Sequence, residues 1–255
     1  MNDRLRPAER MLLDLGIERP QDIDLEAIAW TLGAAVKYRP LDKCEAIIVG
    51  GERRALITVN SKAIPTRRRF SLAHEIGHWH HHRGRILFCG ARDIGNPADD
   101  ALNPEKQADQ FASDLILPAF MVRPRIIEMK RPALAAVREI ADEFEVSDTA
   151  TLLKIIDLDH FPILALCHNK EGRRWFQRAP MIPGWWFPRQ ELDAESFAFE
   201  MLFGDADESA FPRKIGADAW FEFRGAARFE VQEQSFRLPN DEVLTLLILP
   251  DEALG

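Results

Sequence analysis

The chain has 255 residues, 46% of them hydrophobic, with a formal net charge of −8 and a sequence pI near 5.5. This length suffices for two or three small domains, which we expect here. The acidic balance argues against a general binder of nucleic acids or anionic membranes, because phosphate groups require a basic surface. Three scattered cysteines exclude a disulfide framework. The first residues lack an apolar signal segment, and the longest late apolar run, 243–249, is too short to span a bilayer. We therefore expect a cytoplasmic protein.

The region before residue 65 predicts two short helices and then three strands. Apolar residues recur at helical spacing between residues 7 and 33, and Gly16 and Gly33 mark the ends of the two helices. Three runs rich in β-branched residues follow, at 34–39, 46–49 and 55–59. A small antiparallel sheet is the expected result.

The most informative stretch is the run from His74 to His78, His-Glu-Ile-Gly-His, which continues a segment that reads as helix from Pro65. At about 3.6 residues per turn, His74 and His78 lie on one helical face, close enough for both imidazoles to bind one Zn²⁺ ion. Glu75, on the adjoining face, can reach a water molecule at that ion. The alternative is a chance match, or a metal that only holds the fold. Chance does not explain the helical context together with the acidic helix that follows.

The motif implies that a second segment supplies another ligand, because two histidines do not complete a catalytic zinc site. Residues 83–100 read as a loop with several glycines. Helical spacing returns at 104–118, with Asn103 as the N-cap, Pro104 at the first position and Pro118 ending the helix. We look for the third ligand on this helix.

Glu105 and Asp109 are four residues apart and share a helical face. In a thermolysin-like arrangement a glutamate on a second helix binds the metal, and an acid four residues later accepts a hydrogen bond from the first histidine. This assigns Glu105 to the metal and Asp109 to His74. The rival ligand is His81, but three donors on one straight helix would approach a tetrahedral ion from one side. The third histidine of the metzincin pattern is absent, because position 84 is glycine.

The expected chemistry is peptide hydrolysis without a covalent intermediate, with one zinc ion per chain. Three protein ligands leave a fourth position for water, and Glu75 would take its proton and return it to the leaving amine. Two imidazoles and a carboxylate also suit Mn²⁺ and Fe²⁺. An edge strand often holds the substrate of such a peptidase in extended form, and Ala55 to Val59 is the candidate, with an ordinary structural strand as the alternative.

Several other residues have both a functional and a structural interpretation. The oxyanion donor could be Tyr38, which is the only tyrosine, or His160 or His168. Each of the three is also explained as a packing or surface residue. Cys89 lies between the two metal-binding helices, and its thiolate could occupy the fourth zinc position and silence the enzyme. A lone cysteine is more commonly a small buried apolar residue. Histidines 80–82 are expected at a solvated helix end.

Three stretches, Arg69–His78, Glu105–Ala112 and Leu115–Pro118, together resemble the ImmA/IrrE family of metallo-endopeptidases. The resemblance is specific over residues 45–120. It implies that His74, His78 and Glu105 are the zinc ligands and that Glu75 is the catalytic acid–base residue. It also implies that Asp109 orients one of the ligands. Asp109 stands where many members have asparagine.

The resemblance also implies a substrate and a biological role. Members of this family typically cleave a helix-turn-helix repressor, which is often encoded beside them, and so switch on stress-response or mobile-element genes. A helix-turn-helix segment commonly follows the peptidase, and residues 133–158 look like one, with Ser147 as N-cap of the second helix. Residues 133–160, however, carry a net charge of −5. Direct DNA binding by this segment is therefore not expected, and we interpret it as a connector or protein-docking element.

From Phe161 onward, strands dominate and one helix, 193–203, interrupts them. The expected strands are 163–167, 174–178, 220–223, 229–236 and 243–249. Some longer members of the family carry a GAF-like sensor at this point, and the order of elements is compatible with one. Trp185 and Trp186 could line a pocket or an interface, or simply belong to the core.

The sequence thus predicts an α+β protein with three parts: a zinc metallopeptidase domain (1–128), a helix-turn-helix-like connector (129–160) and a C-terminal domain that recognises a signal or a partner (161–255). Two other functions stay open. The chain could be a non-proteolytic zinc protein that sequesters a repressor, or the toxin of a toxin–antitoxin pair.

Overall fold

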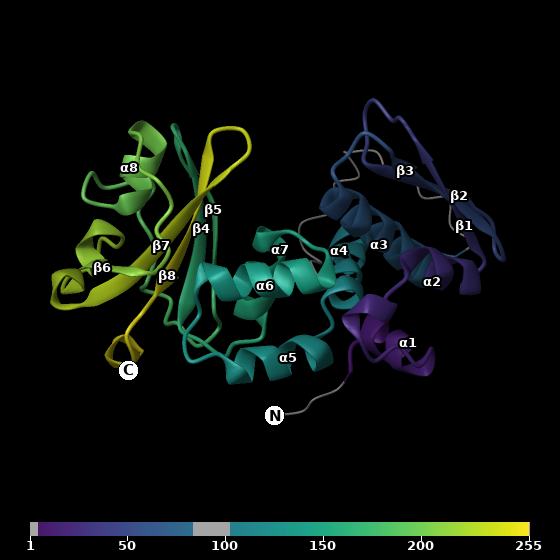
Figure 1. Ribbon diagram of the computed structural model, residues 1–255, viewed down its shortest axis with the longest axis horizontal. Coiled ribbons are helices and arrows are strands. Elements are labelled where there is room, and N and C mark those ends of the chain that lie inside the picture. The colour runs from purple at the N-terminus through teal and green to yellow at the C-terminus, as the bar shows by residue number, and fades with distance from the viewer. Residues whose placement is uncertain (1–4, 84–102, 255) are drawn as a thin grey trace. The chain divides into compact units, whose positions relative to one another are not determined.

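The computed structural model describes residues 5–83 and 103–254 (Figure 1). The chain forms two compact units: unit 1 contains Met1–Val122 and Ala141–Ser147, and unit 2 contains Arg123–Ile140 and Asp148–Gly255. Both helices and sheets are present, so the predicted α+β class is confirmed. The predicted division into three domains stays a prediction. Within the described residues, no helix is long and apolar enough to cross a membrane.

Unit 1 contains the predicted helices and strands with nearly the expected boundaries. Its elements are α1 (Pro7–Asp14), α2 (Leu25–Thr31), β1 (Ala34–Arg39), β2 (Ala46–Gly50), β3 (Ala55–Asn60), α3 (Pro65–His82) and α4 (Pro104–Ile116). Local capping explains where two of the helices begin. Asp24 accepts hydrogen bonds from the backbone N–H groups of Glu26 and Ala27, and Asn103 accepts one from Glu105.

The sheet of unit 1 has the order β1-β3-β2, and it is mixed, with β1 parallel and β2 antiparallel to β3. The prediction of an antiparallel sheet was therefore wrong. Strand β1 pairs in the parallel sense with the side of β3 that does not face β2. The proposal that Ala55 to Val59 is the substrate edge was also wrong, since β3 is paired on both sides. Its alternate residues Ile57 and Val59 are fully buried.

Helix α5 (Ala119–Glu128) was not predicted, because Pro124 lies inside it and reads in sequence as a helix breaker. Pro118 ends α4 as expected, and its carbonyl then accepts the first backbone hydrogen bonds of α5. A second stretch of unit 1 comes from the end of α6 (Leu134–Phe144) and the turn after it. Phe144 and Val146 are buried there, and Glu145 forms an ion pair of 3.4 Å with Arg69 of α3.

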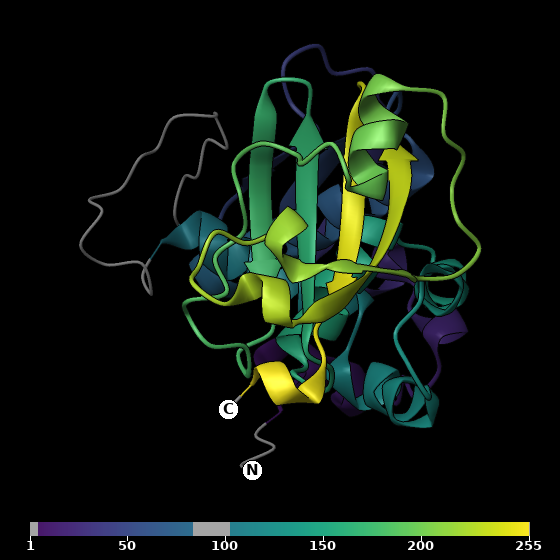
Figure 2. The same cartoon turned by 90° about the vertical axis from the view of Figure 1, so that its left-hand side faces the viewer.

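Unit 2 is built on an antiparallel sheet with the order β5-β4-β8-β7-β6. Its strands are β4 (Ile163–Asn169), β5 (Gly172–Arg178), β6 (Arg213–Gly216), β7 (Glu230–Leu238) and β8 (Glu242–Ile248). Helix α7 (Asp148–Asp157) packs on β4, and α8 (Phe197–Phe203) packs on β7 and β8 (Figure 2). Consecutive residues Glu233 and Gln234 hydrogen-bond to the start of α8 and of α6, respectively. Because neighbouring side chains of a strand point to opposite faces, the sheet is covered on both sides.

Three predictions for unit 2 need correction. Residues 220–223 do not form a strand; a 3₁₀ helix, Ala217–Ala219, precedes them and Phe221 forms only an isolated bridge with Pro188. Strand β6 was not predicted, and α8 begins at Phe197, after the N-cap Ser196, rather than at residue 193. The tryptophan pair divides between two roles, with Trp186 buried in the core and Trp185 61% exposed.

Candidate metal centre

Helix α3 lies between the sheet of unit 1 and helix α4 (Figure 1). Leu72, Ile76 and Trp79 face the interior, and the Trp79 indole N–H donates a hydrogen bond of 2.8 Å to the Leu32 carbonyl. This anchored helix presents His74 and His78 toward the first turn of α4. The apolar spacing of the sequence therefore fixes which face of α3 carries the two imidazoles.

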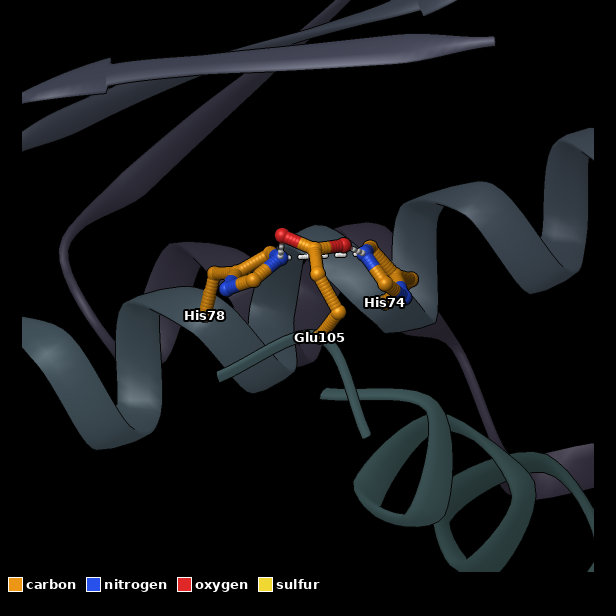
Figure 3. Close-up of side chains that lie close together, drawn as sticks. All are labelled: His74, His78 and Glu105. Carbon is orange, nitrogen blue, oxygen red and sulfur yellow. Dashed lines mark hydrogen bonds and ion pairs between the residues drawn. The ribbon is translucent and has the colours of Figure 1, made fainter. Parts of the chain in front are cut away.

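The two imidazoles and the Glu105 carboxylate converge on one point (Figure 3). The Nε2 atoms of His74 and His78 are 3.0 Å apart, and the two Glu105 oxygens lie 3.3 and 3.4 Å from them. Ligands bound at about 2.0–2.1 Å around a tetrahedral ion are separated by about 3.3 Å. The donor set and its spacing therefore fit a divalent metal. Among the described residues, this is the single group of three such side chains that could hold one.

Asp109 supports this group from behind, as predicted by its spacing from Glu105. Its Oδ1 lies 2.9 Å from Nδ1 of His74 and accepts a hydrogen bond when that nitrogen carries the proton. That contact selects the tautomer in which Nε2 of His74 keeps its lone pair facing His78 and Glu105. The structure thus brings together the four residues His74, His78, Glu105 and Asp109. Their roles as ligands and as orienting residue stay predictions.

The electrostatic environment differs between the two histidines. Burial lowers the pKa of His78 to about 4, with the charge of His74 acting in the same direction, so His78 remains a neutral donor. Burial also lowers the pKa of His74, but its hydrogen bond to Asp109 and the nearby carboxylates outweigh that effect and raise it. Glu105 is half exposed whereas His78 is 1% exposed. The group is therefore open to solvent on the side of Glu105.

Glu75 is buried, at 2% exposure, and its charge acts on two neighbours. It helps to raise the pKa of His74, and, after burial, it is the next cause of the raised pKa of Cys44. Cys44 lies two residues before β2, and α3, which carries Glu75, packs against that strand. Sequence analysis did not single out Cys44, since its closeness to Glu75 arises only from the packing of β2 on α3. The general-base role of Glu75 stays a prediction.

The remaining predicted residues lie elsewhere. The Tyr38 hydroxyl donates to Glu26, and burial followed by this contact raises the Tyr38 pKa to about 12. The rings of His80 and His81 pack against Phe111, and His81 is not part of the converging group. The other two oxyanion candidates belong to unit 2, where one is exposed and one is buried: His160, His168. Cys89 lies outside the described residues.

Comparisons with known proteins cover the region that contains this site. A family model described as the IrrE N-terminal-like domain of the Peptidase_M78 family matches residues 30–155. The radiation response metalloprotease IrrE of Deinococcus radiodurans is 30% identical over 142 residues, which are 53% of this chain and 40% of that protein. The match thus spans less than half of the relative's length.

The fold also has a counterpart among solved structures. A Mycobacterium tuberculosis transcriptional regulator superposes with a TM-score of 0.61, covering 96% of this chain and 87% of that chain at 13% identity. At this identity the likeness establishes a shared fold. The matched family model over residues 30–155, the similar metalloprotease and the converging His74, His78 and Glu105 side chains together support an ImmA/IrrE family metallopeptidase.

Proposed function

We propose that the chain is a zinc-dependent endopeptidase that cleaves a helix-turn-helix transcriptional repressor and so derepresses stress-response or mobile-element genes. The observation that carries the peptidase part is the tetrahedral spacing of His74, His78 and Glu105 beside a buried Glu75. The similarity to a radiation response metalloprotease supports the same reading. The substrate class comes from the family resemblance.

The residues of the site divide the work in this proposal. Bound zinc would polarise the scissile carbonyl and make an attacking water more acidic. His74, His78 and Glu105 hold the ion, and Asp109 keeps the His74 ring in position through Nδ1. A Glu75 carboxylate oxygen accepts the proton of the attacking water and then delivers it to the leaving amine.

The substrate-binding strand in this proposal is β2, in place of β3. It is an edge strand of the three-stranded sheet, and α3 packs against β2 as well as β3. The charge of Glu75 contributes to the raised pKa of Cys44, two residues before β2, and this supports the choice of β2. An extended peptide added to the free edge of β2 would have its backbone hydrogen-bonded and its scissile bond near the metal.

The partner in this proposal is a protein, and its recognition does not require DNA. The helices α6 and α7 and their turn are rich in acidic residues, which disfavours contact with phosphate. The repressor would be recognised as a protein chain that offers an extended segment to the site. We propose that this takes place in the cytoplasm.

The test combines metal content and cleavage. Purified wild type and Glu105→Ala are analysed by mass spectrometry for bound metal, and each is incubated with the repressor encoded beside the gene. Glu18→Ala, at an exposed position of unit 1, is the matched control. We expect one zinc per chain and repressor cleavage in the wild type and in the control, and loss of both in Glu105→Ala.

Other outcomes point to other conclusions. Full zinc content and cleavage in Glu105→Ala would move the third ligand to another residue. Zinc in the wild type with an intact repressor released from DNA would favour sequestration. Growth arrest on expression of this chain alone, relieved by the neighbouring gene, would favour a toxin.

A further inference from the structure

Helices α3 and α4 pack tightly where Gly77 meets Ala108. A methyl group built on Gly77 would lie 3.1 Å from both the Cα and the carbonyl oxygen of Ala108, and 3.2 Å from Cβ of Phe111. None of these atoms is the movable end of a side chain. The absence of a side chain at position 77 is thus what allows the two backbones to pack at this distance.

Residues of the candidate metal site flank the Gly77–Ala108 contact on both helices. Gly77 directly precedes His78 and follows His74 by three residues, while Ala108 directly precedes Asp109 and follows Glu105 by three. Residues three apart on a helix lie on the same side, so the contact lies next to the pairs His74–Asp109, His74–Glu105 and His78–Glu105. We propose that Gly77 is a positioning residue, which sets the distance at which Glu105 and Asp109 meet the two histidines. This rests on the proposed metal site.

A comparison of distances shows why this contact matters. An ordinary contact for Cβ begins at about 3.4 Å, so an added methyl group would displace α4 by a few tenths of an ångström. Metal–ligand distances in working sites stay within about 0.2 Å of their usual values. Glu105 sits in the first turn of α4, where Asn103 holds its backbone, and so it would move with the helix. The displacement therefore exceeds what the metal site tolerates.

The experiment compares Gly77→Ala with Gly51→Ala. A Cβ at Gly51 meets nothing within 4 Å, so this control adds the same methyl group in open space. Zinc affinity is measured by chelator competition without substrate, and the visible spectrum of the cobalt-loaded protein reports ligand geometry. We expect Gly77→Ala to bind zinc about 10–100-fold more weakly, the usual effect of losing an outer contact, with an altered cobalt spectrum. Gly51→Ala should match the wild type.

A second variant tests the spacing without crowding the backbone. Asp109→Glu lengthens the acid that contacts His74 by one methylene group, which the wild-type spacing cannot accommodate. We expect it to weaken zinc binding alone, and the double variant Gly77→Ala/Asp109→Glu to bind zinc more tightly than the product of the two single effects predicts. Circular dichroism of the metal-free proteins checks that each variant is folded.

Two results would overturn the proposal. One is a folded Gly77→Ala protein with wild-type zinc affinity and cobalt spectrum. The other is an Asp109→Glu variant that binds zinc like the wild type, which would show that the spacing is loose; this result counts even when Gly77→Ala does not fold. Neither zinc affinity nor the cobalt spectrum depends on cleavage. If the protein binds zinc but cleaves no repressor, the peptidase proposal fails while the proposal for Gly77 can still be tested.

Discussion

A glutamate in each unit has a different environment: Glu233 of unit 2 is buried and fully hydrogen-bonded, whereas Glu105 of unit 1 is half exposed and faces two histidines. In unit 2, Glu233 is fully buried, and its oxygens accept hydrogen bonds from the Ala198 backbone, the Trp220 indole and the Ser235 hydroxyl. In unit 1, the oxygens of Glu105 face two imidazole nitrogens at 3.3 and 3.4 Å, and the site is open to solvent. A carboxylate surrounded by donors is complete and supports the fold. Two imidazole nitrogens and a carboxylate that converge on one point can together hold a cation.

The largest effect is expected for Glu75→Gln, which keeps the shape of a buried side chain but removes its basicity. Cleavage of the repressor should fall by about 100- to 10,000-fold, the usual contribution of general acid–base catalysis, while zinc content stays at the wild-type level. Single-turnover cleavage and metal analysis on the same preparation measure both. Cleavage at the original rate would show that the base is another residue.

In unit 2, His168 contrasts with Glu233. It is also buried, but among the described residues neither of its ring nitrogens has a hydrogen-bond partner. Burial, assisted by the charge of Arg173, lowers its pKa from 6.5 to about 4. Between pH 6.5 and about 4 the unfolded chain binds a proton that the folded unit does not. The contribution of His168 to the free energy of unfolding should therefore fall as the pH decreases through this range, by about 3 kcal/mol at most, and change no further below it.

The measurement is urea unfolding followed by tryptophan fluorescence, because four of the six tryptophans lie beyond residue 160. His168→Leu should flatten this acid-dependent loss, and His160→Leu, at an exposed position, should retain it. An unchanged pH profile in His168→Leu would assign the acid sensitivity to other groups.

Bound metal should stabilise the folded state of unit 1 and leave the stability of unit 2 unchanged. With free zinc at 100 times its dissociation constant, the folded state gains about 2.7 kcal/mol. Hydrogen exchange with and without a chelator should show increased protection of α3 and α4 on zinc addition in the wild type. The same protection in Glu105→Ala would mean that the ion binds elsewhere.

The smallest of these effects is expected for Glu233→Gln. Its amide can present only one oxygen, so one of the donors around Glu233 loses its acceptor, at a cost of about 1–3 kcal/mol in unit 2. Burial raises the pKa of the Glu233 carboxyl, so the acid contributes less stability as the pH rises through that pKa, and the amide variant should lack this trend. Zinc binding by unit 1 is the control and should not change.

The convergence of the candidate metal-binding side chains could largely be predicted from the sequence because its signals are local. Helical spacing places His74 near His78 and Glu105 near Asp109, and the caps that begin α4 are adjacent residues. The order of the sheet was not accessible, since a run such as Ala55 to Val59 looks the same at an edge and at the centre. Nor was the approach of Cys44 to Glu75, which depends on how β2 packs against α3. Residues 220–223 have the apolar character of a strand, but they follow a 3₁₀ turn.

Unit 1 is assembled from two separate stretches of chain, and this affects its synthesis. The turn that contains Glu145 and Val146 contributes an ion pair to α3 and a buried side chain, but it is made after the whole of α4 and α5. All residues of unit 1 are present only once the chain reaches residue 147. A fragment ending at residue 128 would contain every proposed metal ligand and still lack part of the unit that supports them. We therefore expect a fragment that ends at residue 128 to lack the Arg69–Glu145 ion pair and the buried Val146 side chain.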